Sequence, residues 1–327
     1  MRISVAMACY NGKDYITEQL ESIAKQTRKA DECVIVDDCS TDGTADVIDD
    51  YIQKSGCHNW TLIRNEKNLG YIRAFEVAMG LVNGEIVFLA DQDDVWALNK
   101  IDAMVKVMCK YPQVLSLCTG FAGIDGEGMP LHIRSPFLTE NHGLILLKRM
   151  KKNALCQLTF EDVMQRNVAM GCTMAVRKSL IRLYKASAQT NDMPHDWKLN
   201  FLAAVQEGLY FWNRELTHYR IHGGNTIGMK VASGQIDRDY RIQEYQRYVS
   251  SYHEMENILG DFPVGREQRN RMKKIIRTEK FYSGRIDALE QRNPVKTVLL
   301  VIENIPWFGL HAILGVMDIL HLPKRAR

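Results

Sequence analysis

An apolar run stops abruptly in three aspartates within four positions in the stretch Phe88-Leu89-Ala90-Asp91-Gln92-Asp93-Asp94-Val95-Trp96. Carboxylates crowded in this way repel one another, and a bound cation removes that cost. Carboxylate oxygens are also the ligands that Mg²⁺ and Mn²⁺ prefer. The stretch therefore predicts a metal site at the end of a buried strand. The alternative is a solvated acidic turn in which Asp94 caps a helix that begins near Val95.

Short runs rich in Val, Ile and Leu alternate with helical patterns in the first third of the chain. We expect four strands there, at residues 3–8, 33–38, 60–64 and 85–90. Between the first two, Ile16, Leu20 and Ile23 share one face of a helix. This alternation predicts an α/β fold, Rossmann-like, with a mostly parallel central sheet flanked by helices.

Polar residues follow three of these strands at the point where each strand ends. They are Tyr10-Asn11, Asp37-Asp38 and the acidic turn from Asp91 to Asp94. Ligands of open α/β sheets bind beyond the carboxyl ends of the strands. We therefore expect the three polar sets to converge on one edge of the sheet.

The second half of the chain has a less regular pattern and a helical end. We expect strands at 114–121, 168–176, 210–212 and 216–221, a helix at 197–207, and an irregular excursion with helical pieces at 131–165. From about Gln235 onward the pattern is helical, and its tyrosines are expected to pack between helices rather than to stack on bases. The predicted divisions are two halves of one α/β domain, at 1–125 and 126–234, and a helical C-terminal region at 235–327.

Composition excludes several classes of protein and partner. The formal net charge of +3 is too small to indicate a nucleic-acid partner. The eight cysteines include no C-x-x-C pair, and several lie in apolar runs, which favours buried free thiols in a reducing compartment. The N-terminus runs directly into a predicted strand without the pattern of a signal peptide. A cytoplasmic protein is expected.

The C-terminal tail differs from the rest of the chain. Val298–Ile302 and Ile305–Leu320 are strongly apolar, but polar residues interrupt them before they reach the ~20 residues of a membrane span. Trp307 and Phe308, with basic residues near the end of the chain, are typical of a helix that lies in a membrane interface. We expect peripheral attachment to the inner face of the cell membrane. The alternative is packing onto the α/β domain or onto a partner chain in an oligomer.

Four short motifs appear in order on this strand and helix pattern. They are Tyr10-Asn11, Val36-Asp37-Asp38-x-Ser40-Thr41-Asp42-Gly43-Thr44, Asn68-Leu69-Gly70 and Asp91-x-Asp93-Asp94. Together they resemble the nucleotide-sugar half of a family 2 glycosyltransferase with a GT-A fold. The resemblance implies a donor-binding half at 1–125 and an acceptor-binding half at 126–234. Cys39 departs from the family pattern, because glycine or another small residue is usual there.

The resemblance implies a role for each motif. Asp37 and Asp38 would contact the nucleotide base, Asp91 the ribose, and Asp93 the metal. Arg73 would lie near the base or the diphosphate. The remaining residues that the resemblance assigns to donor binding are Tyr10, Asn11, Asn68, Gly70 and Gln92.

Two later segments are similar to bacterial rhamnosyltransferase-like members of the family. They are Met193-Pro194-His195-Asp196-Trp197 and Tyr219-Arg220-Ile221-His222-Gly223-Gly224-Asn225. Attack of an acceptor hydroxyl on a sugar needs a base, and Asp196 is the candidate, with Asp192 as the second choice. The alternative role of Asp196 is to cap a helix that starts at Trp197. His222 would complete the metal shell or bind the diphosphate, and Gly171, Cys172 and Trp197 would line the acceptor side.

These features predict an inverting glycosyltransferase that depends on Mn²⁺ or Mg²⁺. The donor would be dTDP-rhamnose or a UDP-hexose, and the acceptor a glycan or lipid-linked glycan of a bacterial surface polysaccharide. Two alternatives are a nucleotidyltransferase that acts on sugar phosphates and a catalytically silent GT-A binding module. The segment Ala8-Cys9-Tyr10-Asn11-Gly12 lacks the glycine- and basic-rich phosphate loop that a nucleotidyltransferase would normally carry.

Overall fold

The computed structural model describes residues 1–131, 150–187, 193–223, 238–293, 295–296 and 299–300. The chain divides into two compact units. The first unit contains Met1–Ala186 and Pro194–Met229, and the second contains Ser187–Met193 and Lys230–Arg327. The boundary between a donor-binding and an acceptor-binding half lies inside the first unit and stays a prediction.

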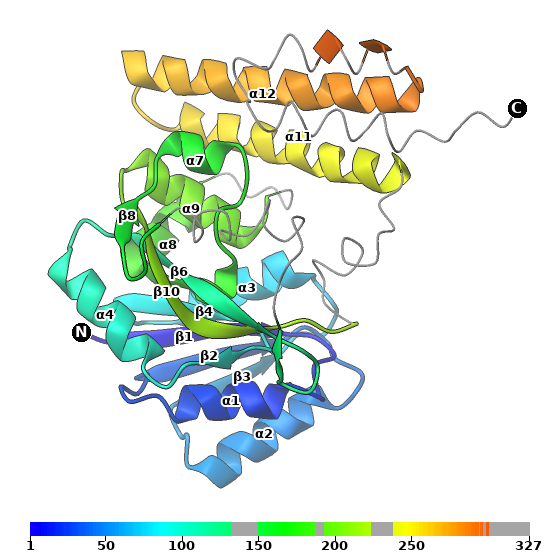
Figure 1. Cartoon of the computed structure of the whole chain (residues 1–327). Helices are drawn as coiled ribbons and strands as arrows, with labels where there is room; N and C mark the ends of the chain where they lie inside the picture. The colour runs from blue at the N-terminus through cyan, green and yellow to red at the C-terminus, as the bar shows by residue number, and fades with distance from the viewer. Residues whose placement is uncertain (132–149, 188–192, 224–237, 294, 297–298, 301–327) are drawn as a thin grey trace, which may run out of the picture. The chain divides into compact units, whose positions relative to one another are not determined.

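The first unit begins with four parallel strands and the helices between them (Figure 1). The strands are β1 (Ile3–Cys9), β2 (Glu32–Asp37), β3 (Trp60–Arg64) and β4 (Ile86–Ala90). The helices are α1 (Ile16–Ala24), α2 (Thr44–Ser55) and α3 (Tyr71–Leu81). Every residue of β1, β2 and β4 is buried, as expected for parallel strands covered on both faces. The four predicted strands are confirmed.

The sheet continues in the order β3-β2-β1-β4-β9-β6-β10-β5. Its further strands are β5 (Val95–Trp96), β6 (Ser116–Ile124), β7 (Pro130–Leu131), β8 (Leu155–Gln157), β9 (Met174–Arg177) and β10 (Leu209–Arg220). The further helices of the first unit are α4 (Lys100–Lys110), α7 (Phe160–Met164), α8 (Lys178–Ala186) and α9 (His195–Val205). β9 runs antiparallel between β4 and β6, while β6 and β10 are parallel. The predicted α/β fold with a mostly parallel sheet is confirmed.

Three local predictions were wrong. Val95 does not begin a helix, because Val95 and Trp96 form β5 and pair with the end of β10; Asp94 therefore does not cap a helix there. The segment at 168–176 is a 3₁₀ turn at Gly171–Thr173 followed by β9, not one long strand. The two short strands expected at 210–221 are one strand, β10, whose pairing with β6 shifts register between Trp212 and Thr217. The polar residues at this shift mark an irregular stretch of strand rather than a turn.

The second unit contains two long helices, α11 (Arg238–Gly260) and α12 (Arg266–Glu290). Tyr245 and Tyr252 of α11 are buried against Tyr282 of α12, with ring centroids 5.4 and 5.8 Å apart. Helix packing of these tyrosines is confirmed. Among the described residues, no helix is both long enough and apolar enough to span a bilayer. The apolar tail lies almost entirely outside the described residues.

Candidate functional site

The acidic turn lies at the carboxyl end of β4 and is fastened to the end of β1. The backbone N–H of Tyr10 donates to Gln92 Oε1 at 2.7 Å, and Gln92 Nε2 donates to the Tyr10 carbonyl at 3.0 Å. The side chain of Gln19 donates to the Asp91 carbonyl at 2.8 Å. These bonds bring two predicted donor-binding segments side by side.

The end of β2 is tied to the same edge. The N–H of Asn11 donates to Ser40 Oγ at 2.9 Å, and Asn11 Oδ1 accepts from the N–H of Thr41 at 2.8 Å. Asp37 is buried and accepts from the N–H of Ser40 at 3.0 Å. Cys39 has a φ of 65°, which explains why a glycine or small residue suits this turn. The predicted convergence of three strand ends is confirmed.

Asp38 holds the loop that precedes α3. Its carboxylate accepts from the N–H groups of Leu69 and Gly70 at 2.9 and 2.8 Å and from Asn65 Nδ2 at 2.7 Å. Asn68 Oδ1 also accepts from the Gly70 N–H, at 3.0 Å, and Gly70 has a φ of 82°. Asp38 and Asn68 thus shape this loop, and their contact with a donor stays a prediction.

Asp93 and His222 form the pair expected to hold a metal. Asp93 Oδ2 lies 2.9 Å from His222 Nε2, and both side chains are mostly buried. Two adjacent ligands on an octahedral Mg²⁺, each about 2.1 Å from the ion, lie about 3 Å apart. The ring of Tyr15 lies beside the imidazole, with centroids 4.3 Å apart. The carboxylate and imidazole form a hydrogen bond in this structure, and the same spacing also fits two ligands of a shared divalent cation.

Asp91, Asp94 and Cys172 form a second acidic group close by. One ligand atom from each lies within 4.8 Å of the others, the only such set of three or more among the described residues. Burial and then the charge of Asp93 raise the pKa of Asp94 to about 7, while burial and Asp94 raise the pKa of Asp91 well above its usual value. Burial and then Asp94 also raise the pKa of Cys172. A sulfur ligand suits Mg²⁺ or Mn²⁺ less well than carboxylate oxygens do.

Lys100 supplies a fully buried positive charge next to this group. Its Nζ donates to the Cys172 carbonyl and to Thr217 Oγ1 at 2.5 and 2.9 Å, and it lies 4.0 Å from the centre of a Trp96 ring. Burial lowers the pKa of Lys100 to about 8, although Asp94 and Asp91 act in the opposite direction. One buried lysine thus faces two aspartates, Asp91 and Asp94, and a bound cation would offset further negative charge there.

Asp196 is held at the first turn of α9, next to the acidic group. Its Oδ2 accepts from the N–H of Gly171 at 3.0 Å and its Oδ1 from the N–H of Trp197 at 2.7 Å. The charge of Asp196 is one of the influences that raise the pKa of Asp91. The helix begins two residues earlier than expected, at His195 with Pro194 as its N-cap, so Asp196 is not the cap. The candidate base and the candidate ribose contact therefore share one site.

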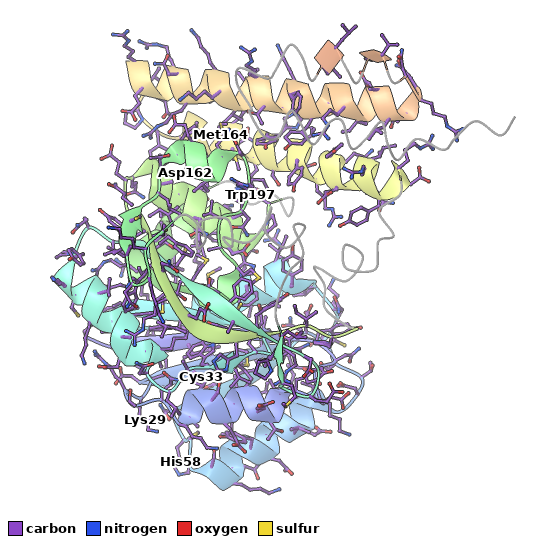
Figure 2. The ribbon with its side chains drawn as sticks, in the orientation of Figure 1. Lys29, Cys33, His58, Asp162, Met164 and Trp197 are labelled. Atoms are coloured by element: carbon purple, nitrogen blue, oxygen red, sulfur yellow. The ribbon has the colours of Figure 1, made fainter. Side chains whose placement is uncertain are left out.

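Two other predicted site residues have packing or pairing partners. Trp197 is 3% exposed, and its indole donates to the Val163 carbonyl of α7 at 2.7 Å; Figure 2 labels Trp197 and, on α7, Asp162 and Met164. Arg73 forms an ion pair with Glu76, one turn away on α3. Trp197 lies in the core, so its place on the acceptor side is indirect at most, and the role of Arg73 stays a prediction. Asp192 lies outside the described residues.

His195 and Arg220 are site residues that the sequence reasoning missed. His195 is buried, and neither ring nitrogen has a hydrogen-bond partner among the described residues. Its ring stacks on Phe75 at 4.0 Å, and a Cβ at Gly171 would lie 2.9 Å from its Nε2. Arg220 contacts the acidic turn directly. The only signal in the sequence was their position in the two quoted motifs, since neither contact is local.

Comparisons with known proteins agree with this geometry. The model of the family described as "Glycosyl transferase family 2" matches residues 4–176. A Bacillus subtilis protein described as a teichuronic acid biosynthesis glycosyltransferase, TuaG, is 27% identical over 223 residues, which cover 67% of this chain and 79% of that protein. Poly(ribitol-phosphate) beta-N-acetylglucosaminyltransferase TarS of Staphylococcus aureus is 36% identical over 135 residues, 40% of this chain and 22% of TarS.

Solved structures show the same fold. Residues 1–349 of S. aureus TarS, solved with UDP-GlcNAc, align with a TM-score of 0.63 and 16% identity over 98% of this chain and 89% of that one. The mannosyltransferase PcManGT from Pyrobaculum calidifontis, solved with GDP-Man and Mn²⁺, aligns with a TM-score of 0.57 and 19% identity over 99% of this chain and 81% of that one. At these identities the match establishes the GT-A fold.

Proposed function

The chain belongs to glycosyl transferase family 2, and we propose that it is an inverting enzyme that moves a hexose from a nucleoside diphosphate to an acceptor hydroxyl, with a divalent cation at Asp93 and His222. The observation that carries this proposal is the convergence of Asp91, Asp93, Asp94 and Asp196 at the carboxyl edge of the sheet. Family membership argues against the nucleotidyltransferase alternative. Mn²⁺ or Mg²⁺ fits the carboxylate and imidazole donors.

Each group has a distinct task in the proposed reaction. Asp37 and Asp91 orient the nucleoside, and Asp196 accepts the proton of the acceptor hydroxyl. The acceptor oxygen forms a bond to the anomeric carbon while the bond from that carbon to the diphosphate oxygen breaks. The electron pair leaves with the diphosphate, so a single displacement inverts the anomeric configuration. The bound cation would offset charge on the diphosphate as a Lewis acid.

The two hydrogen bonds on Asp196 fix the direction of its carboxylate. The N–H groups of Gly171 and Trp197 each take one lone pair, which holds the side chain in place and leaves further lone pairs for a hydroxyl proton. A general base must lie within hydrogen-bond reach of the proton it removes. A Cβ at Gly171 would lie 2.9 Å from His195 Nε2, so the glycine lets the start of α9, with Asp196, pack closely against this backbone. This geometry supports Asp196 as the base.

The proposed partners follow from the same comparisons. Relatives named for teichuronic acid and poly(ribitol-phosphate) favour a bacterial cell-surface polymer as the acceptor. TarS solved with UDP-GlcNAc favours a UDP-hexose over dTDP-rhamnose as the donor. A lipid-linked glycan acceptor would suit a tail that lies on the inner face of the membrane.

A thermal-shift screen tests the proposed function. UDP-glucose, UDP-GlcNAc, dTDP-rhamnose and GDP-mannose are each added with Mn²⁺ or with EDTA. One UDP-sugar is expected to raise the Tm with Mn²⁺ and much less with EDTA, since a ligand that binds only the folded state stabilises it. Asp93→Ala should lose the Mn²⁺-dependent part of the shift. If no nucleotide raises the Tm, the proposed donor site is wrong; an equal shift with EDTA would contradict the metal.

A further inference from the structure

We propose that Arg220 is a positioning residue that fixes the backbone of the acidic turn and thereby sets the affinity of the site for its cation. This inference rests on the proposed function, since it concerns the same metal. Arg220 ends β10, two residues before His222. It reaches three separate segments of the chain, and its guanidinium is buried while its main partner is exposed.

The first set of contacts runs from Arg220 to the acidic turn. The backbone N–H of Arg220 donates to Asp94 Oδ1 at 3.2 Å, and its Nε donates to the Asp93 carbonyl at 2.8 Å. One residue therefore holds the side chain of Asp94 and the main chain of Asp93. Because the Asp93 carbonyl is held, the region that the Asp93 carboxylate can reach beside His222 is restricted.

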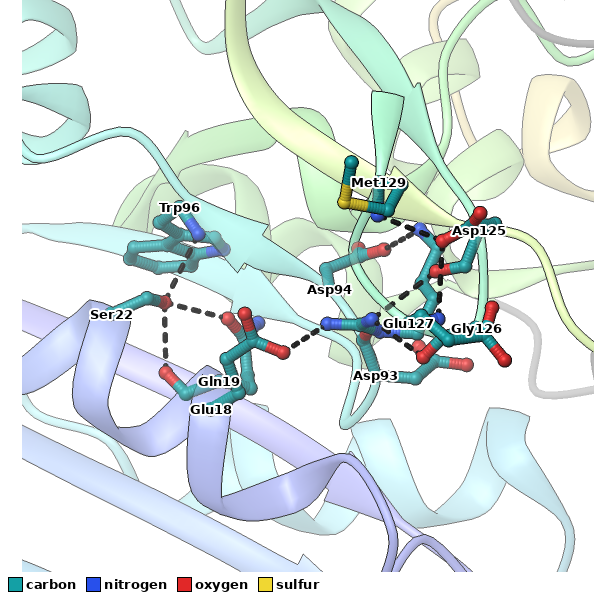
Figure 3. Close-up of polar contacts among 11 residues, drawn as sticks. Glu18, Gln19, Ser22, Asp93, Asp94, Trp96, Asp125, Gly126, Glu127 and Met129 are labelled. Atoms are coloured by element: carbon teal, nitrogen blue, oxygen red, sulfur yellow. Dashed lines mark hydrogen bonds and ion pairs between the residues drawn. The ribbon is translucent and has the colours of Figure 1, made fainter. Parts of the chain in front are cut away.

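The other contacts anchor Arg220 itself. Its Nη1 donates to the carbonyls of Asp125 and Gly126 at 3.2 and 3.0 Å, and its Nη2 forms an ion pair with Glu18 of α1. Figure 3 shows Glu18, Asp93, Asp94 and the Asp125–Gly126 backbone gathered around these contacts. The planar fork of an arginine serves acceptors in several directions at once, which a single ammonium group cannot do.

The ring of Tyr15 connects Arg220 with His222. The guanidinium carbon lies 5.1 Å from the centre of the Tyr15 ring, and the imidazole of His222 packs at 4.3 Å from the same ring. The two partners of the proposed cation, Asp93 and His222, are thus both positioned by contacts that involve Arg220. Loss of such an outer partner of a metal ligand typically weakens metal binding by about 10–100-fold.

The simpler view is that Arg220 only stabilises the fold, as a buried arginine with many partners would. That view predicts a lower Tm but no particular change in the affinity of the folded protein for a cation. The positioning role predicts a clear loss of affinity of the folded protein for the cation, whatever the change in Tm. The difference can be measured on protein without any sugar donor.

The test measures how tightly the Arg220→Lys variant binds Mn²⁺ in the presence of UDP. The electron paramagnetic resonance signal of free Mn²⁺ reports the binding. The Kd for Mn²⁺ is expected to rise at least about tenfold. With a UDP-sugar donor, activity should recover as Mn²⁺ is raised, whereas Asp196→Asn should not respond to added Mn²⁺. An unchanged Kd in a folded variant would overturn the positioning role.

The control is Arg177→Lys. Arg177 also donates to backbone carbonyls, those of Val114 and Met108 at 2.8 and 2.7 Å, and none of these residues belongs to the proposed site. The Kd of the Arg177→Lys variant for Mn²⁺ should stay within about twofold of the wild-type Kd. Loss of an outer partner of a metal ligand changes the affinity far more. A change as large as that of Arg220→Lys would mean that any loss of arginine packing has the effect.

Glu18→Lys provides a second variant if Arg220→Lys does not fold. Glu18 is 56% exposed on α1, so the fold should tolerate the change, and the new charge faces the guanidinium. Loss of this ion pair should raise the Kd for Mn²⁺ about threefold, as expected for a partly exposed pair. An unchanged Kd in this variant would contradict the inference. If the wild type itself binds no Mn²⁺ with UDP, the proposed metal fails instead.

Discussion

Buried carboxylates lie at both edges of the sheet, but their hydrogen bonds and pKa shifts differ. Glu32 begins β2 at the amino edge, while the acidic turn after β4 lies at the carboxyl edge. The Glu32 carboxylate accepts from Ser4 Oγ, from the N–H groups of Asn83 and Gly84, and from Arg2. Burial raises the pKa of Glu32, but the hydrogen bonds from Ser4 and Asn83 outweigh it and bring the pKa below its usual value.

The aspartates of the acidic turn have the opposite electrostatics. Burial and then the neighbouring carboxylates raise the pKa of both Asp91 and Asp94, so the ionised forms are disfavoured. The fold therefore fully compensates a carboxylate that only supports the structure and only partly compensates the ones beside a proposed cation site. Strongly perturbed pKa values that cluster in this way are typical of functional sites.

The largest expected effect comes from Asp196→Asn, beside the carboxyl edge of the sheet. It should lower activity, whereas a change at the amino edge should not. The amide keeps the shape of the side chain but cannot accept the acceptor proton, and its NH₂ must face the N–H of either Gly171 or Trp197, so kcat should fall by about 10²–10⁴. Donor binding, measured as the thermal shift with UDP-sugar, should stay at the wild-type level. Normal turnover in this variant would place the base elsewhere.

Glu32→Gln should show the reverse pattern, with lower stability and unchanged turnover. The amide NH₂ would face N–H groups that now donate to a carboxylate, and the expected loss is about 2 kcal/mol in the free energy of unfolding. The folded-state pKa is depressed, so this contribution is present above the usual pKa of 4.5 and is lost as the pH falls through the folded value. Urea unfolding at pH 7 and pH 3.5 measures it. A gap that widens in acid would contradict the assignment.

Asp94→Asn should have the smallest effect. It should raise the free energy of unfolding, whereas Glu32→Gln should lower it. The folded-state pKa of about 7 lies above the usual 3.8, so the folded protein holds a proton that the unfolded chain releases, and stability falls as the pH rises through this window. In EDTA at pH 8 the variant should be more stable by about 1 kcal/mol, because Asn is neutral and Oδ1 still accepts from the Arg220 N–H. At pH 4 the difference should vanish. Destabilisation at pH 8 would mean that the carboxylate is compensated after all.

Most of the sheet was predictable from sequence because the β-α alternation is local. The residues that follow β1, β2 and β4 could be placed at one edge for the same reason, since parallel strands end together. The errors arose where the partner is distant: Val95 pairs with His218, which overrides a pattern that reads as the start of a helix.

The site was predictable to the same extent. Asp91 to Asp94 and Asp37 follow from strand ends, and Asp196 follows from a resemblance. The ion pair between Glu18 and Arg220 joins residues 202 positions apart, and the burial of His195 against Phe75 depends on how α3 and α9 pack. Such contacts leave no periodic or local trace in the sequence.

The antiparallel strand β9 has a consequence for how the chain reaches its native state. It occupies the middle of the sheet between β4 and β6, yet it comes from residues 174–177, after both of its neighbours in sequence. The nascent sheet therefore exposes the edge of β4 until β9 arrives, and non-local pairing of this kind slows folding. A fragment that ends at residue 125 would keep that edge open, and we expect it to aggregate rather than to fold as an independent nucleotide-binding module.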